Sequence, residues 1–243
     1  MNPQLQPEQE LRQRLQNVHE RIRAAAMRSD RVPEDITLVA VSKTHAAETI
    51  SQAIAAGATD LGENRVQEAD AKIPLVGREA ARWHLIGHLQ SNKVRRAVEL
   101  FDVIHSLDSA ALARRLDRVC GEVGRKVLPV LIQVDLGKEA TKSGAAETEL
   151  PKIIEAIKQT QTLRLLGLMT LPPYFDDPNL TRPFFRRLRE LRDELAAQGA
   201  FGEQSGQLSM GMTNDFEVAI EEGATMVRVG TAIFGERGSP TQT

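Results

Sequence analysis

The chain has 243 residues, of which 41% are hydrophobic and 26% charged, enough to bury one substantial core. Lysine and arginine number 31 against 33 aspartate and glutamate, so no basic field would gather nucleic acid or an acidic membrane surface. Aromatic residues amount to 4%, which leaves little material for stacking on nucleic-acid bases. We therefore expect a globular protein whose partner is a small molecule, with no nucleic acid and no membrane.

Cysteine usage and the N-terminal segment indicate a cytoplasmic protein. Cys120 is the single cysteine, so neither an intramolecular disulfide nor a thiolate metal cage can form. Residues 1–27 are polar and lack the apolar run that a signal peptide or a membrane span needs. Short loops and few exposed aromatic residues favour a monomer.

Strand and helix patterns alternate along the chain. The first is an apolar stripe at helical spacing, which predicts an amphipathic helix. Its members are Leu11, Leu15, Val18 and Ile22. Residues 36–41 then form a short, β-branched apolar run, typical of a strand buried on both faces of a parallel sheet. Seven further strand candidates lie at 60–64, 82–87, 103–107, 127–136, 163–171, 207–212 and 226–234. Glycines stand where the intervening helices should end, at Gly57, Gly121, Gly199 and Gly223.

Eight strands that alternate with helices predict an α/β fold, a single (β/α)₈ barrel of the TIM type with an extra N-terminal helix. The barrel would form one domain over residues 1–243, with a core of about 36–235. An open, doubly wound sheet gives the same local signals, but the number of strands favours the barrel. Residues 172–178 read as a long loop between a strand and a helix.

Lys43 is the first candidate functional residue, because barrel enzymes use the C-terminal ends of their strands and Lys43 follows the first strand. Apolar walls at the mouth of the barrel would disfavour the charged amine and lower its pKa, as a Schiff-base lysine requires. The alternative is a strand-end lysine that simply reaches into solvent.

A second candidate site follows the last two strands. Residues 209–213 and the pair Gly230 and Thr231 are small, lie after a strand and precede a helix. Their free backbone N–H groups and hydroxyls could bind a phosphate dianion, and barrels commonly bind phosphate there. Otherwise the glycines serve only to form tight turns.

Other residues give weaker signals. His84 and His88 share a strand face but lack a third ligand, and Gly87 between them suggests close backbone packing, so we expect no metal site. Lys138 and Lys142 lie in the loop after the fifth strand and could meet a phosphate or a released aldehyde, or could simply be exposed.

The motifs together resemble the pyridoxal phosphate homeostasis proteins. They are VAVSKT at 39–44, GEN at 62–64, WHLIG at 83–87, LQSNK at 89–93, KSG at 142–144, GLM at 167–169, LSMGM at 208–212 and VRVGTAIFG at 227–235. Their order and spacing match the family over nearly the whole chain from residue 36 to residue 235.

The resemblance implies a fold-type III barrel, similar to the N-terminal domain of alanine racemase, that holds pyridoxal 5′-phosphate. Lys43 matches the family's internal-aldimine lysine, and Asn64 would lie near the cofactor ring. Arg228 matches the arginine that faces the pyridine nitrogen. The positions that match the family's phosphate site are Ser209, Gly211, Gly230 and Thr231.

Arg228 also bears on catalysis, because a guanidinium is permanently protonated and cannot give the ring nitrogen a stable proton. The ring is then a weak electron sink. The single tyrosine, Tyr174, lies in the loop after the sixth strand and does not match the racemase tyrosine. We therefore assign no catalytic residue and expect a protein of pyridoxal phosphate and amino-acid homeostasis without robust catalytic activity. The alternatives are a cofactor-dependent amino-acid racemase and a class I aldolase that uses Lys43 without a cofactor.

Overall fold

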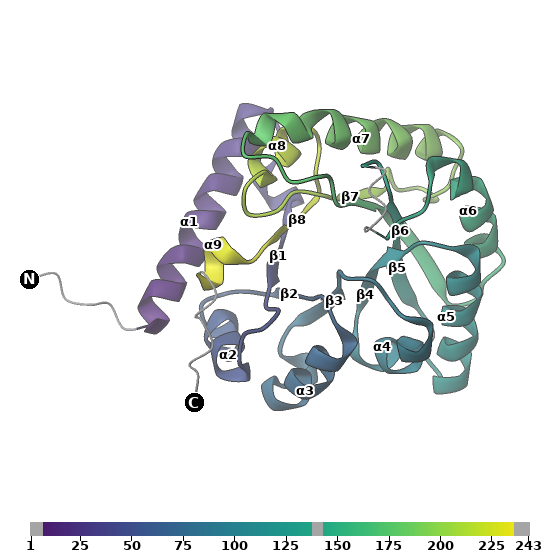
Figure 1. The fold of residues 1–243 in the computed structure, drawn as a ribbon, viewed down its shortest axis with the longest axis horizontal. Coiled ribbons are helices and arrows are strands. Elements are labelled where there is room, and N and C mark those ends of the chain that lie inside the picture. Colours follow the sequence, from purple (N-terminus) through teal and green to yellow (C-terminus); the bar gives the residue numbers. More distant parts are fainter. Residues whose placement is uncertain (1–6, 138–142, 236–243) are drawn as a thin grey trace, which may run out of the picture.

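Eight parallel strands close into a barrel in the order β1 to β8 in a computed structural model that describes residues 7–137 and 143–235 (Figure 1). The strands are β1 (Thr37–Val41), β2 (Asp60–Glu63), β3 (Arg82–Leu85), β4 (Val103–Leu107), β5 (Leu128–Val134), β6 (Leu163–Thr170), β7 (Gln207–Ser209) and β8 (Met226–Val229). Because β1 pairs with both β2 and β8, the sheet has no open edge. The predicted barrel is confirmed and the open sheet is excluded.

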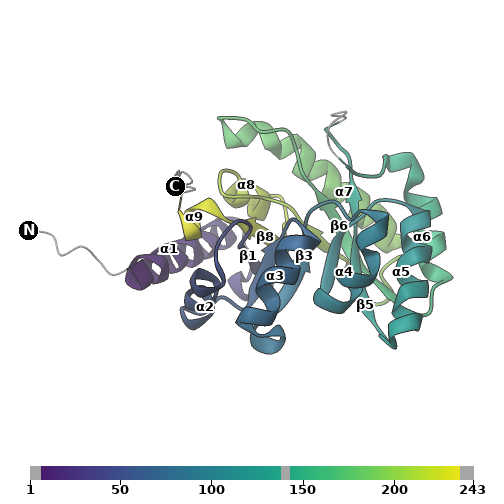
Figure 2. The same cartoon turned by 60° about the horizontal axis from the view of Figure 1, so that its bottom comes forward.

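The helices surround the barrel in a ring, which the tilted view of Figure 2 shows from a second direction. They are α1 (Pro7–Arg28), α2 (Ala47–Ala55), α3 (Val66–Val76), α4 (Val94–Leu100), α5 (Ala110–Val123), α6 (Leu150–Lys158), α7 (Arg182–Ala197), α8 (Phe216–Glu221) and α9 (Thr231–Phe234). The predicted N-terminal helix is α1, which packs against α2, α8 and α9. Its four predicted apolar positions, from Leu11 to Ile22, are all buried.

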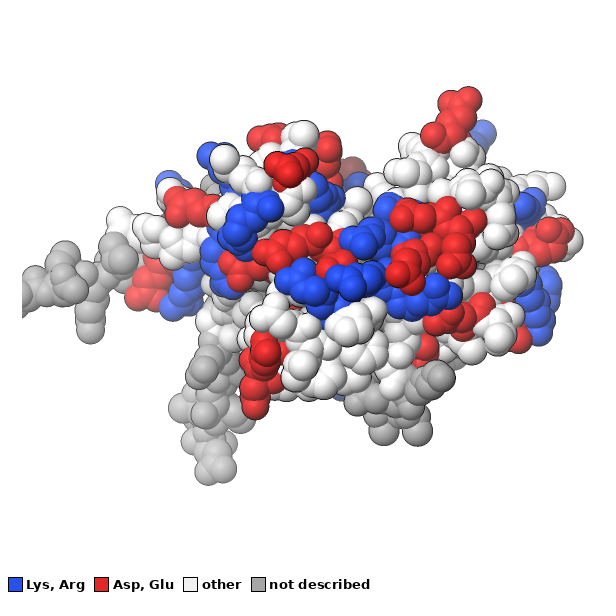
Figure 3. All heavy atoms as spheres, turned by 90° about the horizontal axis from the view of Figure 1, so that it is seen from above, with Lys and Arg blue, Asp and Glu red and all other residues white. Residues whose placement is uncertain are grey.

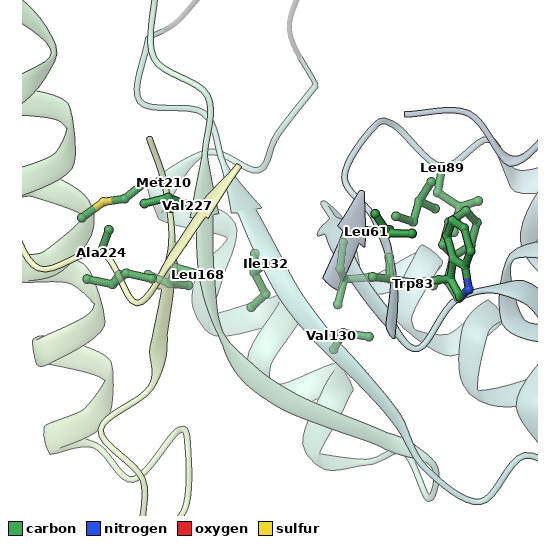
Figure 4. Close-up of a cluster of buried hydrophobic side chains, with 14 of the residues drawn as sticks. Leu61, Trp83, Leu89, Val130, Ile132, Leu168, Met210, Ala224 and Val227 are labelled. Carbon is green, nitrogen blue, oxygen red and sulfur yellow. The ribbon is translucent and has the colours of Figure 1, made fainter. Parts of the chain in front are cut away.

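The apolar core has two layers. The larger layer lies between the strands and the helices, and Figure 4 labels members such as Leu61, Trp83 and Val227. A smaller cluster, which includes Val103 and Leu131, lies on the inner face of the strands and occupies part of the barrel interior. Alternate residues of each strand therefore serve different layers, as the two-residue period of a strand requires.

Several predicted element boundaries are wrong; the strands predicted at 82–87 and 207–212, for example, end at Leu85 and Ser209. The predicted strand 226–234 ends at Val229, and its second half forms α9, because a continuous apolar run does not distinguish a strand from a buried helix. The helix end predicted at Gly121 lies instead at Gly124. Gly124 adopts a left-handed φ of +75° and donates its N–H to the carbonyl groups at the end of α5.

Charged side chains of both signs interleave over α1, α7 and α8 (Figure 3). At the centre of this network, the buried carboxylate of Glu222 accepts hydrogen bonds from Arg182, Arg186 and Arg189 of α7. These ion pairs join neighbouring helices of the ring. Among the described helices, none combines the length and the apolar character needed to cross a bilayer.

Candidate functional site

A cavity of about 480 Å³ opens at the C-terminal ends of the strands. Its walls come from the segments that follow β1, β2, β3, β6, β7 and β8. Five of the residues predicted from the sequence line it, namely Lys43, Asn64, Arg228, Gly230 and Thr231. Ser209 and Gly211 do not line it and lie behind its wall. The volume and the mix of apolar and convergent polar groups are typical of a small-molecule site.

Lys43 is half-buried and follows β1 by two residues. A buried cluster holds the strand end in front of it: Ser42 Oγ donates to Glu63 Oε1 at 2.7 Å. Lys72 Nζ from α3 donates to the Ser42 carbonyl oxygen at 3.0 Å and to Glu63 Oε1 at 3.1 Å. Burial raises the pKa of the Glu63 carboxyl, and the Lys72 charge opposes that rise. We call Ser42, Glu63 and Lys72 the Glu63 clamp.

The backbone directly after Lys43 is strained. Thr44 has a φ of +68°, a left-handed conformation that β-branched residues rarely adopt. Its N–H donates to Glu68 Oε2 at 3.0 Å, and the His45 N–H closes the turn on the Ser42 carbonyl at 3.2 Å. Such strain is stored where a surrounding structure over-determines it, commonly at functional sites. The turn and the Glu63 clamp together fix the backbone of Lys43.

The position of Asn64 depends on Gly87, in the segment after β3. A Cβ added at Gly87 would lie 2.2 Å from the Asn64 carbonyl oxygen, so only glycine permits this approach. The close backbone packing predicted at Gly87 is confirmed. It fixes the segment after β2 against the segment after β3 at the cavity wall.

Arg228 lies on β8 with its side chain inside the barrel and is 2% exposed. Its Nη1 donates to Ser209 Oγ at 2.6 Å and its Nη2 to the Thr170 carbonyl oxygen at 2.8 Å. Burial lowers the pKa of Arg228 to about 10, and the Asp215 carboxyl opposes that decrease. The guanidinium is therefore still charged at neutral pH.

Two turns after β7 and β8 carry backbone donors. Within the described residues, the N–H groups of Thr213, Asn214 and Thr231 have no hydrogen-bond partner. The turn after β7 is held by Asp215, whose Oδ1 accepts the Met212 N–H at 2.6 Å. Both turns border the cavity, so they could bind an anion as predicted.

Gly211 serves the packing of this wall. It has a φ of +91°, and a Cβ at this position would lie 2.6 Å from Ala219 Cβ and 2.8 Å from Phe216 Cα. Only glycine therefore allows α8 to approach the end of β7, which sets the position of the turn that follows.

A chain of buried polar groups lies behind Ser209 and was not predicted from the sequence. Ser209 Oγ lies 2.9 Å from His105 Nδ1, and His105 Nε2 lies 2.8 Å from His84 Nδ1. His84 Nε2 in turn lies 2.8 Å from Asp60 Oδ1. The signal was present, because His84 and His105 occupy inward positions of strands, but the pairing of different strands cannot be read from one sequence.

The remaining candidates lie elsewhere. His84 and His88 do not share a strand face, because β3 ends at Leu85 and leaves His88 in a loop, 3.6 Å from Asp108. The part of the chain that the structure describes contains no group of three potential metal ligands. Lys138 and Lys142 lie outside the described residues.

The loop after β6 forms the outer rim of the cavity. Tyr174 lines the cavity but is 73% exposed, and Asn214 Nδ2 donates to the Phe175 carbonyl oxygen at 3.0 Å. This bond ties the predicted 172–178 loop to the turn after β7.

Comparison with known proteins decides the family. Residues 13–238 match the alanine racemase N-terminal domain family. Pyridoxal phosphate homeostasis proteins of Aquifex aeolicus and Pseudomonas aeruginosa are each 44% identical to the chain, over 225 and 222 residues. These matches cover 93% and 90% of this chain, and 97% and 94% of the relatives. The chain belongs to the pyridoxal phosphate homeostasis protein family.

Solved structures agree with this membership. PipY of Synechococcus elongatus, solved with pyridoxal phosphate bound, is 40% identical, with a TM-score of 0.77 over 93% of this chain and 100% of PipY. The alanine racemase of Clostridium difficile is 17% identical, with a TM-score of 0.71 over 96% of this chain and 58% of the racemase, which shows a shared fold alone. The resemblance read from the sequence motifs is thus confirmed for the family and for the fold.

Proposed function

We propose that this chain binds pyridoxal 5′-phosphate covalently through the Lys43 amine and exchanges it, so that it buffers the supply of this reactive aldehyde. The observation that carries the proposal is the cavity that brings Lys43, the buried Arg228 guanidinium and the Thr213 and Thr231 turns together. Family membership and the cofactor-bound PipY structure support it.

The groups at the cavity suit the chemistry of this cofactor. An aldehyde combines with a primary amine, a phosphate dianion accepts from N–H and O–H donors, and an unprotonated pyridine nitrogen accepts a hydrogen bond from a donor that keeps its own proton. Lys43, the Thr213 and Thr231 turns, and Arg228 are of these three types. The cofactor, when bound, supplies the aldehyde that combines reversibly with amines.

Each chain residue then has a separate task. The Lys43 amine would hold the aldehyde carbon, and Arg228 would donate to the ring nitrogen. Gly230 and Thr231 would hold the phosphate, with Gly211 and Ser209 behind the cavity wall. Asn64 would contribute the side of the cavity next to Lys43.

Absorbance and mass spectrometry test the proposal. Protein incubated with the cofactor should absorb in the visible region, and borohydride reduction followed by proteolysis should leave the adduct on Lys43. Lys43→Ala should lose both signals while circular dichroism stays unchanged. The control Lys158→Ala, at the end of α6, should retain them. A reducible adduct at the wild-type level in Lys43→Ala would show that another lysine binds the cofactor.

We also propose that the chain acts as a cytoplasmic monomer without a nucleic-acid partner. Size-exclusion chromatography with light scattering should give a mass near 26.8 kDa, with and without the cofactor. A concentration-independent mass of twice that value would replace the monomer with a dimer.

A further inference from the structure

We propose that Asp60, His84, His105 and Ser209 form a hydrogen-bond chain with one fixed direction, and that this chain makes Ser209 a positioning residue for Arg228 and not a phosphate donor. The chain runs through the inside of the barrel from β2 through β3 and β4 to β7, and it ends on β8. The direction of the chain follows from the geometry of the protein alone. The role of Arg228 toward the ring nitrogen rests on the proposed function.

The direction is fixed at the Asp60 end. An ionised carboxylate can only accept, so the 2.8 Å contact requires His84 to carry its hydrogen on Nε2. Burial is the largest single influence on the pKa of Asp60 and raises it, but the hydrogen bond and charge of His84, with the Thr59 hydrogen bond and the Arg82 charge, together lower it, so the carboxylate form is favoured. Burial also lowers the pKa of His84, so the ring is neutral and its Nδ1 has no hydrogen.

The same logic passes along the chain. A bare Nδ1 on His84 must accept, so His105 carries its hydrogen on Nε2. Burial lowers the pKa of His105 well below its usual value, and the nearby His84 and Arg228 lower it further. The neutral His105 ring therefore offers a lone pair at Nδ1, and the hydroxyl of Ser209 must donate to it.

The contact at the Arg228 end is compatible with this direction but does not fix it alone, because a hydroxyl oxygen can accept two hydrogen bonds. A guanidinium only donates, so Ser209 Oγ accepts from Arg228 Nη1 and retains its own hydrogen for another partner. His105 Nδ1 is that partner. The reverse direction would place a bare His84 Nε2 against the Asp60 carboxylate, with two lone pairs facing each other at 2.8 Å.

Two consequences follow for the site. The single hydrogen of the Ser209 hydroxyl is directed to His105, so the hydroxyl has none to donate to a phosphate. Arg228 is held by two acceptors, Ser209 Oγ and the Thr170 carbonyl, while its three other guanidinium N–H bonds have no partner within the described residues. These are the donors that remain for a ligand in the cavity.

The direction of the chain can be measured on the protein without cofactor. In ¹⁵N-labelled protein at pH 7.5, long-range imidazole correlations distinguish the Nε2–H tautomer from the Nδ1–H tautomer. We expect Nε2–H for both His84 and His105, with assignments from single substitutions of the other three histidines. A hydrogen on Nδ1 of His105 would overturn the proposal, and this result needs no bound cofactor and leaves Asp60, His84, His105 and Ser209 unsubstituted.

The role of Ser209 is separated from phosphate binding by comparing two ligands, pyridoxal 5′-phosphate and pyridoxal, which lacks the phosphate. Ser209→Ala removes an acceptor from a charged donor and should weaken both ligands by about the same factor, roughly tenfold or more. Thr231→Ala is the matched control and should weaken pyridoxal 5′-phosphate alone.

The outcomes are distinct. A loss confined to pyridoxal 5′-phosphate in Ser209→Ala, or no loss for either ligand, would overturn the positioning role. If wild-type protein binds neither ligand, the proposed function fails, whereas the tautomer measurement still decides the direction of the chain.

Discussion

Ser42, the residue before Lys43, donates a hydrogen bond from its Oγ to the buried carboxylate of Glu63 at 2.7 Å. Lys72 closes this clamp from α3 and is itself 13% exposed. The lysine that faces the cavity is therefore fixed by an ion pair that lies outside the barrel wall, on the helix side of β2. Disturbing this pair should affect Lys43 without touching the cavity.

Glu63→Gln should test this connection. The substitution preserves the shape of the side chain but leaves the largely buried Lys72 ammonium without its main counter-charge, which should destabilise the fold by about 2–4 kcal/mol. Cofactor retention should fall as well, because the turn after Lys43 loses an anchor. Urea denaturation and equilibrium dialysis measure the two effects. A destabilised variant with unchanged retention would separate the clamp from the site.

Thr44→Gly should relieve the strain after Lys43. A left-handed backbone destabilises the folded state by about 1–2 kcal/mol for a non-glycine residue, and glycine removes this cost. Glycine also makes the unfolded chain more flexible, which reduces the free energy of unfolding by about 0.5–1 kcal/mol. We expect stability equal to or up to about 1 kcal/mol above wild type, with weaker cofactor retention.

Asp30→Gly is the matched control for this prediction. Asp30 is the other non-glycine residue with a positive φ among the described residues, at +53°, and it follows α1. It should show a similar stability change with unchanged retention. Equal retention in Thr44→Gly and Asp30→Gly would show that the strain does not serve the site.

The sequence was sufficient for the barrel because each strand is a separate apolar run with its own glycine or polar boundary. It was insufficient where an apolar run continued into a helix, as at 226–234, since burial hides the change of period. The positions of Lys43 and of the turns after β7 and β8 at the cavity were predictable because these residues follow strands directly. They depend on local order alone.

The interior chain was not predictable because it depends on register. Asp60 pairs with Arg82 of β3, which brings His84 two residues further along into reach of the Asp60 carboxylate. His105 on β4 contacts His84 on the neighbouring strand β3 and Ser209 on β7, across the barrel. The stagger between strands decides these contacts, and no single strand carries that information.

The buried histidines predict a loss of stability in mild acid. Burial lowers the folded-state pKa of both His84 and His105, with Arg82 lowering both further and Asp60 and Asp102 opposing the shift at His84. Below the unfolded pKa of about 6.5, the unfolded chain binds protons that the folded chain does not. Stability is therefore complete above about pH 6.5 and falls below it, by up to about 1.4 kcal/mol per pH unit for each histidine.

Urea denaturation at pH 7.5, 6.5 and 5.5 measures this slope, and the proton uptake on unfolding gives the number of groups. His88→Gln, which removes a ring that is about half exposed outside the barrel, should leave the slope unchanged. Unfolding free energies that stay constant from pH 7.5 to pH 5.5 would mean that His84 and His105 can accept protons inside the barrel.

The cavity lacks an oriented second acid–base group that an amino-acid racemase would need within the described residues. A racemase needs acid–base groups on both faces of its substrate, and such groups contribute about two to four orders of magnitude each. Lys43 would supply one face, whereas Tyr174 is 73% exposed on the cavity rim and makes no side-chain hydrogen bond within the described residues that would orient it. In the proposed site Arg228 would keep its own proton, so the ring nitrogen would gain little electron-withdrawing power.

We therefore expect no racemase-like turnover with L-alanine. Incubation in deuterated water should give slow, Lys43-dependent exchange of the α-hydrogen with retention of configuration. Mass spectrometry measures the exchange, and chiral chromatography measures the configuration. Tyr174→Phe should leave the exchange rate unchanged. Inversion at about 10 per second or more, the range of working enzymes, would establish the racemase instead. Loss of that inversion in Tyr174→Phe would identify the rim tyrosine as the second base, because Lys43 can reach only one face of a bound amino acid.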